Sequence, residues 1–175
     1  MSALPETEGA LSAQAWQRVD REIAKFPPQQ KRSAVVAALA IAQEELGWLP
    51  GWAIEAVALY LGMPPIAAYE VATFYTMYDL QPPGRFKLAL CTNLPCALSG
   101  ATRAAARLKA KLGIGFEETS ADGLFTLKEG ECFGACGDAP VLLVNNKRMC
   151  SFMSDPRLDE LIAELRAAAP GKAAT

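Results

Sequence analysis

Two pairs of cysteines with short and unequal spacings constrain this chain more than any other feature. The first pair, Cys91 and Cys96, has the spacing C-x4-C, and the second pair, Cys132 and Cys136, has the spacing C-x3-C. The two pairs are separated by 35 residues, and each pair directly follows a strand-like run. Because loops that follow neighbouring strands meet at one edge of a sheet, we expect the four sulfurs to lie close together.

Four thiols in two pairs are the donor set that iron prefers in a 2Fe-2S cluster, which takes two thiolates for each iron. The spacing therefore favours a cluster bound by Cys91, Cys96, Cys132 and Cys136. A zinc ion with four thiolates is an alternative, although structural zinc sites usually contain C-x2-C pairs, and neither pair here has that spacing. Two disulfides are a further alternative, which a reducing compartment disfavours.

Several other chemistries lack the residues that they need. The chain contains no histidine, which excludes Rieske ligation, zinc sites with two histidines, and catalysis by a histidine base. It has no C-x-x-C pair, no Walker A motif and no G-x-S-x-G motif. We therefore expect an electron carrier with no catalytic residues and no nucleotide or flavin of its own.

The residues around the cysteines suit a site that gains negative charge on reduction. Gly134 and Gly137 allow the backbone to approach closely, so that N–H groups can point at sulfur. Thr92 and Ser99 are candidate hydroxyl donors to the sulfurs. The fifth cysteine, Cys150, is expected to be a packed or partly buried free thiol, with a fifth ligand or a sensor thiol as the alternative.

The fold class expected from the hydrophobic pattern is α+β, with an N-terminal helical bundle followed by an α/β domain. The segment Leu-Gln-Pro-Pro-Gly at 80–84 interrupts the pattern and is typical of a linker. It separates a helical domain at 13–79 from an α/β domain at 85–168. Residues 1–12 and 169–175 are expected to form flexible tails.

The expected elements follow the apolar periodicity and the Pro and Gly positions. In the first half, helices are expected at 13–26, 29–46, 52–61 and 64–78. In the second half the order is β-α-β-β-β-α, with a possible short strand near Phe116. Its strands are expected at 85–91, 124–131, 141–144 and 147–153, and its helices at 98–112 and 155–168, the last capped by Asp155.

Two groups of side chains have both a structural and a functional interpretation. An aromatic stripe, Phe74, Tyr75 and Tyr78, is expected to pack in the core, with a docking face for another chain as the alternative. The basic side chains of the helix at 98–112 are expected to be solvated, with a partner contact as the alternative. These basic side chains are Arg103, Arg107, Lys109 and Lys111.

Composition and charge limit location and partners. The formal net charge of −2 gives no indication of nucleic-acid binding. No run of 18 uncharged apolar residues is present, so we expect no direct membrane span. The acidic N-terminus resembles neither a secretory signal nor a transit peptide, which favours a cytoplasmic protein with reduced thiols.

The cysteine motifs with their flanking residues resemble a known family. The segments Cys91-Thr-Asn-Leu-Pro-Cys96 and Glu131-Cys-Phe-Gly-Ala-Cys-Gly-Asp-Ala-Pro140 resemble the thioredoxin-like 2Fe-2S ferredoxin subunit (the E subunit) of bacterial NADH:quinone oxidoreductase, respiratory complex I. The segment Ala72-Thr-Phe-Tyr-Thr-Met-Tyr78 is also similar to that family. The resemblance covers residues 15–168 and has no departure at the four cysteines.

This resemblance implies a thioredoxin-like C-terminal domain and one 2Fe-2S cluster, with Cys91 and Cys96 on one iron and Cys132 and Cys136 on the other. It implies a non-catalytic electron-transfer subunit whose partner is the flavoprotein subunit, which carries FMN, the NADH site and a further iron-sulfur cluster. The helical half would help to dock onto that partner. Other peripheral-arm subunits of the complex would complete the assembly, on the cytoplasmic side of the bacterial inner membrane. Ferredoxin subunits of NAD-dependent formate dehydrogenases and NAD-reducing hydrogenases are similar, and a zinc-stapled interaction module is the third alternative.

Overall fold

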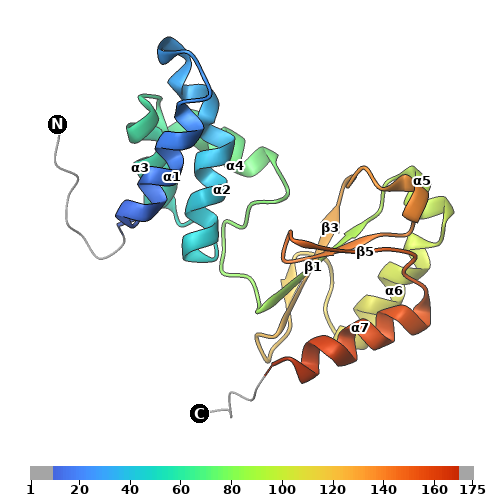
Figure 1. Ribbon diagram of the computed structural model, residues 1–175. Helices are drawn as coiled ribbons and strands as arrows, with labels where there is room; N and C mark the ends of the chain where they lie inside the picture. The colour runs from blue at the N-terminus through green and yellow to red at the C-terminus, as the bar shows by residue number, and fades with distance from the viewer. Residues whose placement is uncertain (1–9, 170–175) are drawn as a thin grey trace. The chain divides into compact units, whose positions relative to one another are not determined.

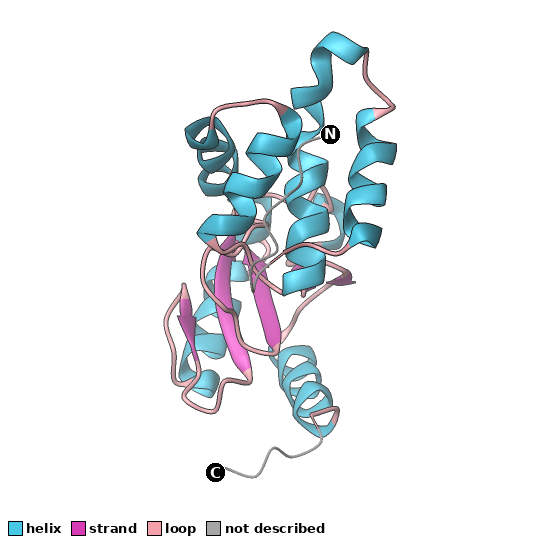
Figure 2. Cartoon of the chain, turned by 90° about the vertical axis from the view of Figure 1, so that its left-hand side faces the viewer, coloured by secondary structure: helices cyan, strands magenta, loops and turns pink. Residues whose placement is uncertain are grey.

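The computed structural model describes residues 10–169, and the chain divides into two compact units between Pro82 and Pro83. Among these residues the N-terminal unit holds only helices, whereas every strand lies in the C-terminal unit (Figure 2). Of the tails predicted at 1–12 and 169–175, residues 1–9 and 170–175 lie outside the described residues. The expected α+β class, with a helical half followed by a half that combines strands and helices, is confirmed.

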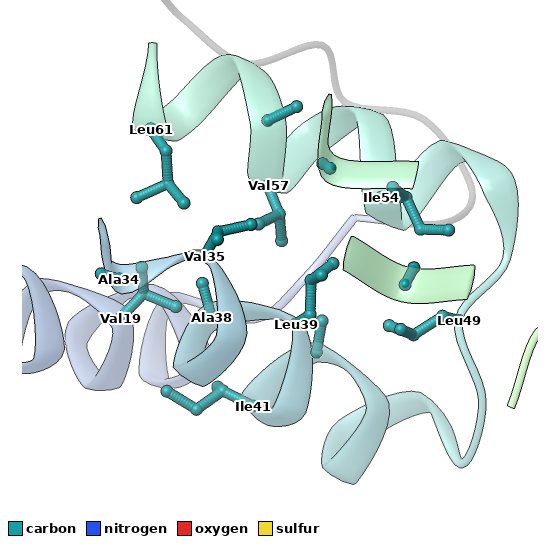
Figure 3. Close-up of a cluster of buried hydrophobic side chains, with 14 of the residues drawn as sticks. Val19, Ala34, Val35, Ala38, Leu39, Ile41, Leu49, Ile54, Val57 and Leu61 are labelled. Carbon is teal, nitrogen blue, oxygen red and sulfur yellow. The ribbon is translucent and has the colours of Figure 1, made fainter. Parts of the chain in front are cut away.

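Within residues 10–82, the N-terminal unit is built from four α-helices and one 3₁₀ helix. Side chains from α1, α2 and α3 meet in one apolar core, in which Val19, Leu39 and Val57 are fully buried (Figure 3). Gly47 ends α2 in the left-handed conformation, with φ of 83°, where a residue with a side chain would be strained. The elements are α1 (Ala13–Ile23), η1 (Pro28–Ala34), α2 (Val35–Leu46), α3 (Gly51–Leu61) and α4 (Pro65–Phe74).

The start of this unit corrects the predicted N-terminal tail. Leu11 is buried in the helical core, and Ser12 caps α1 by accepting a hydrogen bond from the backbone N–H of Ala15. The backbone N–H and the hydroxyl of Ser12 both donate to the carboxylate of Glu45, at 2.7 and 2.6 Å. An N-capping serine satisfies an N–H group that the helix leaves unpaired, so the ordered chain begins before Ala13.

Several predicted helices are also shorter than expected: the helix predicted at 13–26 ends at Ile23, and the helix predicted at 98–112 begins at Ala101. The helix predicted at 29–46 is split, because η1 covers Pro28–Ala34 with a non-helical residue at Gln30, and α2 follows it. The helix predicted to reach residue 78 ends at Phe74, because Tyr75 is extended with ψ of 118°. Neither of the last two boundaries has a Gly or Pro at the point where the helix changes, which is why the residue pattern did not reveal them.

The aromatic stripe divides between its two interpretations. Tyr78 is buried, and its hydroxyl donates to the carbonyl oxygen of Val36 at 2.7 Å, so this residue belongs to the core. Burial raises the pKa of Tyr78 well above its usual value. Phe74 and Tyr75 are 77% and 43% exposed, which is unlike core packing. The core prediction is therefore wrong for these two rings.

The C-terminal unit begins inside the predicted linker. The backbone N–H of Gly84 donates to the hydroxyl of Thr126 at 2.6 Å. A Cβ atom on Gly84 would lie 2.9 Å from the carbonyl carbon of Phe125, so only glycine allows this approach. Gly84 is thus held against the following sheet and does not belong to a free linker.

A five-stranded mixed sheet with helices on one face forms the C-terminal unit (Figure 1). The strand order is β2-β3-β1-β4-β5, in which β1 and β3 are parallel and the other neighbours are antiparallel. The strands are β1 (Phe86–Cys91), β2 (Glu118–Thr119), β3 (Phe125–Gly130), β4 (Leu142–Val144) and β5 (Arg148–Cys150). The helices are α5 (Leu94–Leu98), α6 (Ala101–Leu112), the 3₁₀ helix η2 (Cys136–Asp138) and α7 (Asp155–Ala167).

Apolar residues at every second position of the strands face α6 and α7. Leu88 of β1 is paired with Leu127 of β3 on one side and Val144 of β4 on the other, and all three are buried. Leu158 and Ile162 of α7 are buried in the same cluster. The period of two in the strands and of four in α7 explains why these elements were predicted. Ser154 occupies the N-cap position of the last helix without a side-chain capping hydrogen bond, so Asp155 is the first helical residue and the predicted cap is one position late.

The basic side chains of α6 lie beside carboxylates of α7. Arg107 and Lys111 form ion pairs with Asp159, and Arg103 lies 3.3 Å from the carboxylate of Asp155. The predicted solvated face is therefore only partly correct, because these cations are exposed and also paired. Spacing within the sequence could not show that the carboxylates of α7 lie beside the basic side chains of α6.

Asp159 is expected to titrate far below an ordinary aspartate. Hydrogen bonds from Arg107 and then Lys111 lower the pKa of Asp159 to about 2, whereas an unfolded chain has a value of ~3.9. The ion pairs of Asp159 therefore add to folding stability at pH values above the pKa of Asp159 in the unfolded chain. This stabilisation is lost as the pH falls through the lower pKa of Asp159 in the folded chain. A carboxyl-carbon NMR titration of Arg107→Gln should show a higher Asp159 pKa, while Arg103→Gln should leave it unchanged. An Asp159 pKa that Arg107→Gln does not move would contradict the assigned ion pair.

Candidate metal centre

The first cysteine pair lies at the carboxyl end of β1, where both thiols are buried. Cys91 is the last residue of β1, and Cys96 lies inside α5, and each is 2% exposed. The side chain of Asn93 accepts a hydrogen bond from the N–H of Leu94 at 2.9 Å and thereby begins α5. This short helix turns Cys96 back towards Cys91, and both belong to one small apolar cluster.

The electrostatic surroundings of Cys91 are set by burial and by its partner thiol. Burial raises the pKa of Cys91, and the neighbouring Cys96 thiol raises it further. Backbone N–H groups of Asn93 and Phe133 lower the same pKa. The Cys91 thiol donates to the carbonyl oxygen of Glu131 at 3.1 Å. The second cysteine loop therefore already contacts the first pair through its backbone.

The second pair lies in the loop that follows β3, and both of its thiols are exposed. The N–H of Gly134 lies 3.4 Å from the sulfur of Cys132, as expected for a backbone donor to sulfur. Gly134 has φ of +71°, which favours glycine at this point of the turn. Cys136 begins the 3₁₀ helix η2. An N–H of Gly137 directed at sulfur stays a prediction.

Apolar side chains of the second loop pack against the first pair. Phe133, Ala135 and Ala139 contact the cluster that contains Cys91 and Cys96. The ring of Phe133 lies over Gly130, where an added Cβ would come within 2.3 Å of it, so a side chain at this strand end would displace the ring. The backbone N–H of Thr92 also donates to the carbonyl oxygen of Gly130, at 3.0 Å. The two cysteine loops are therefore adjacent.

The structure brings the first pair together and leaves the second pair at the surface. Among residues 10–169, no group of three or more Cys, Asp or Glu side chains is close enough to hold a metal ion. The donor set nevertheless fits an iron-sulfur cluster, because four thiols on two adjacent loops are the ligands that such a cluster takes. The four cysteines as ligands remain a prediction.

Two predicted hydroxyl donors are engaged elsewhere. The hydroxyl of Thr92 donates to the carboxylate of Glu129 at 2.8 Å, and that of Ser99 donates to the carbonyl oxygen of Pro95 at 2.8 Å. The prediction that they point at sulfur is therefore wrong in this structure. Ser99 lies four residues after Pro95, where a serine hydroxyl commonly bonds back to the preceding turn.

Cys150 lies outside the two cysteine loops, at the end of β5. It is half-buried and packs against the apolar core of the C-terminal unit, as expected for a packed free thiol. Burial raises the pKa of Cys150, and the Arg148 guanidinium partly offsets this effect.

The short helix α5 is the element of the site that sequence reasoning missed. It carries Cys96 and the exposed residues on either side of that cysteine. Asn93 followed by Pro95 is a helix-start signal that could have revealed it, because asparagine is a common N-cap and proline favours the first turn.

Comparison with known proteins gives consistent results over most of the chain. The E subunit of NADH-quinone oxidoreductase from Rickettsia conorii is 49% identical over 125 residues, which are 71% of this chain and 75% of the relative. The corresponding protein of Rickettsia bellii is 45% identical over 145 residues, covering 82% of this chain and 86% of the relative. The second E subunit of Rhizobium meliloti is 43% identical over 152 residues, covering 87% and 89%.

A solved structure shares the fold. The crystal structure of an NAD+-reducing [NiFe]-hydrogenase in the air-oxidized state matches 78% of this chain with a TM-score of 0.65 and 24% identity. The match spans only 23% of the hydrogenase chain, so the likeness concerns the fold alone. The model of the thioredoxin-like [2Fe-2S] ferredoxin family matches residues 19–166. The chain therefore belongs to the thioredoxin-like [2Fe-2S] ferredoxin family.

Proposed function

We propose that this chain is the electron-transfer subunit of an NADH-quinone oxidoreductase and binds one 2Fe-2S cluster. The observation that carries the proposal is the position of both cysteine loops at the carboxyl ends of the parallel strands β1 and β3, in a member of this family. Relatives that are E subunits of NADH-quinone oxidoreductases support the choice of complex. When bound, the cluster supplies the ability to accept and release one electron at a time.

The residues proposed to hold the cluster are Cys91, Cys96, Cys132 and Cys136. Cys91 and Cys96 would supply a buried, apolar wall, and Cys132 and Cys136 would supply the ligands nearest to solvent. The N–H of Gly134, which already points at the sulfur of Cys132, would stabilise its thiolate. The chain itself makes and breaks no bonds in the substrate, so it is proposed to be a non-catalytic subunit.

The proposed partner is the flavoprotein subunit of the same complex, which would exchange single electrons with this chain through FMN and supply the NADH site and further iron-sulfur clusters. Other peripheral-arm subunits would complete the assembly, peripheral to the cytoplasmic side of a bacterial inner membrane. Among the described residues, no helix is long and apolar enough to cross a membrane. The relatives' names support this assembly over a hydrogenase, because the hydrogenase likeness concerns the fold alone.

The proposal is tested by the metal content of the protein after purification without oxygen. We expect about two irons and about two inorganic sulfides per chain, and a spin-half EPR signal after reduction with dithionite. One zinc per chain with no EPR signal would overturn the electron-transfer function and favour a structural zinc site.

A further inference from the structure

Exposed apolar side chains border the cysteine loops. Leu94 and Leu98 are 67% and 81% exposed, and their spacing of four residues on α5 places them on one face of the helix. Cys96 lies between them in sequence and is buried. The backbone N–H of Phe152, which is 52% exposed, donates to the carbonyl oxygen of Asp138 at 2.8 Å. Phe152 is thereby held beside the second cysteine loop.

Negative charge gathers in the second of these two loops. Residues 91–100 contain no charged side chain, and residues 129–141 contain three carboxylates and no basic side chain. All three of these carboxylates are exposed, and they belong to Glu129, Glu131 and Asp138. The thiolate ligands of the proposed cluster add further negative charge at this point. The charged side chains of these loops are therefore all negative, whereas Arg157 of α7 donates to the carbonyl oxygen of Ser151, next to Phe152 in the chain, at 2.9 Å.

This local charge is opposite to that of the unit as a whole. After Leu80 the chain has 12 basic and 10 acidic residues, which gives a formal charge of +2. Arg103, Arg107 and Lys111 of α6 form ion pairs with carboxylates of α7. These three cations are therefore paired with carboxylates of α7. The charged side chains within the cysteine loops themselves are the three carboxylates.

We propose that Leu94, Leu98 and Phe152, with the three loop carboxylates, form the docking face for the electron-exchange partner of this chain. The partner surface that fits it has an apolar recess bordered by Lys and Arg side chains, because apolar anchors inside a charged rim are typical of specific interfaces. The inference rests on the proposed function, since electron exchange requires the partner to approach the cysteines. Cys132 and Cys136 are exposed in these loops, so a partner seated here would lie close to the proposed cluster.

The charge pattern distinguishes this occupant from two others. A second copy of the chain would bring like charges together at a symmetric interface, which disfavours association. An anionic lipid surface would be repelled by the same carboxylates. A basic redox protein is the occupant for which both the apolar side chains and the surrounding charges are favourable.

Binding of the recombinant FMN-containing subunit of the same organism's NADH-quinone oxidoreductase tests the docking face. With the double variant Leu94→Ser/Leu98→Ser, we expect the Kd to rise by more than about tenfold, because exposed leucines that become buried act as anchors. The control, Met149→Ser, removes a side chain that is 41% exposed on β5 of the same unit and lies outside the cysteine loops. We expect it to change the Kd by less than about twofold.

The charged rim has its own test. Glu131→Gln should slow association and weaken the dependence of the association rate on ionic strength, because it removes one steering charge. The control, Glu160→Gln, removes an exposed carboxylate of α7 and should leave both quantities unchanged. If Glu131→Gln and Glu160→Gln changed the association rate equally, the proposal that carboxylates of the cysteine loops steer the partner would be contradicted.

The metal content of every variant is measured before binding, so that the two proposals fail separately. A wild-type chain without iron or sulfide would overturn the proposed function. A wild-type chain with its cluster that does not bind the partner, or a serine double variant that binds with unchanged Kd, would overturn the docking face. An equal rise in the Kd of the apolar control variant would also overturn the docking face. Self-association that Leu94→Ser/Leu98→Ser abolishes would assign the face to a second copy.

Discussion

Replacing Cys132 with serine is expected to remove the 2Fe-2S cluster while leaving the chain folded. The Cys132 side chain is exposed and lies outside the apolar core, so its replacement removes little packing. Serine is a harder donor than a thiolate and is a poor ligand for iron in this type of site. Because groups that only support metal ligands already contribute about 10–100-fold to metal affinity, loss of a ligand should exceed this effect.

Iron and sulfide analysis, visible absorption and EPR measure this loss, and far-UV circular dichroism measures whether the chain stays folded. Cys136→Ser should behave in the same way, because Cys136 is also exposed. The matched control is Cys150→Ser, which should retain about two irons per chain. A Cys132→Ser protein with wild-type iron, sulfide and EPR signal would show that Cys132 is not a ligand. Loss of the cluster in Cys150→Ser would overturn the assignment of the four ligands.

The variants of the exposed pair are more informative than those of the buried pair. Cys91 and Cys96 are packed with Ala101 and Val141, so replacing either one changes an apolar cluster as well as a ligand. A loss of iron in those variants would have two explanations. The exposure of Cys132 and Cys136 separates ligation from packing, which the sequence spacing by itself did not allow.

Elements with strong periodicity were predictable from the sequence. The alternation of Phe86, Leu88 and Leu90 indicated a strand, and the structure places Phe86–Cys91 in β1. The same pattern indicated β3. The pair Asn145-Asn146, between the strands predicted at 141–144 and 147–153, is typical of a tight hairpin turn, and both residues have positive φ between β4 and β5. These features depend on the period of side chains along one element, which a single segment of sequence contains.

Features that depend on contacts between distant segments were not predictable. The carboxylate that pairs with Arg107 and Lys111 comes from α7, more than 40 residues further along the chain. The glutamate that accepts from Ser12 is likewise on another helix, which is why an ordered helix start resembled a tail. Spacing could identify the cysteines and their loops, but the different burial of the two pairs arises from packing between the loops.

Phe125→Ala is expected to destabilise the C-terminal unit by ~3–5 kcal/mol, the range typical of removing a buried phenylalanine. Phe125 of β3 is fully buried, and its ring centroid lies 6.0 Å from that of Phe86. The guanidinium carbon of Arg166 lies 5.2 Å from the same ring, so the substitution also removes a cation–π contact. Hydrogen exchange of β1 and β3 amides measures this free energy within the C-terminal unit alone.

Phe74→Ala is the matched control, because it removes the same side chain at a position that is 77% exposed in the N-terminal unit. Its effect on the free energy of unfolding should stay within about 0.5 kcal/mol, as for most surface substitutions. All three tryptophans, Trp16, Trp48 and Trp52, belong to the N-terminal unit, so their fluorescence during urea unfolding measures that control. Because cavity cost depends on how completely a side chain is enclosed, equal losses for Phe125→Ala and Phe74→Ala would contradict the core described for the sheet.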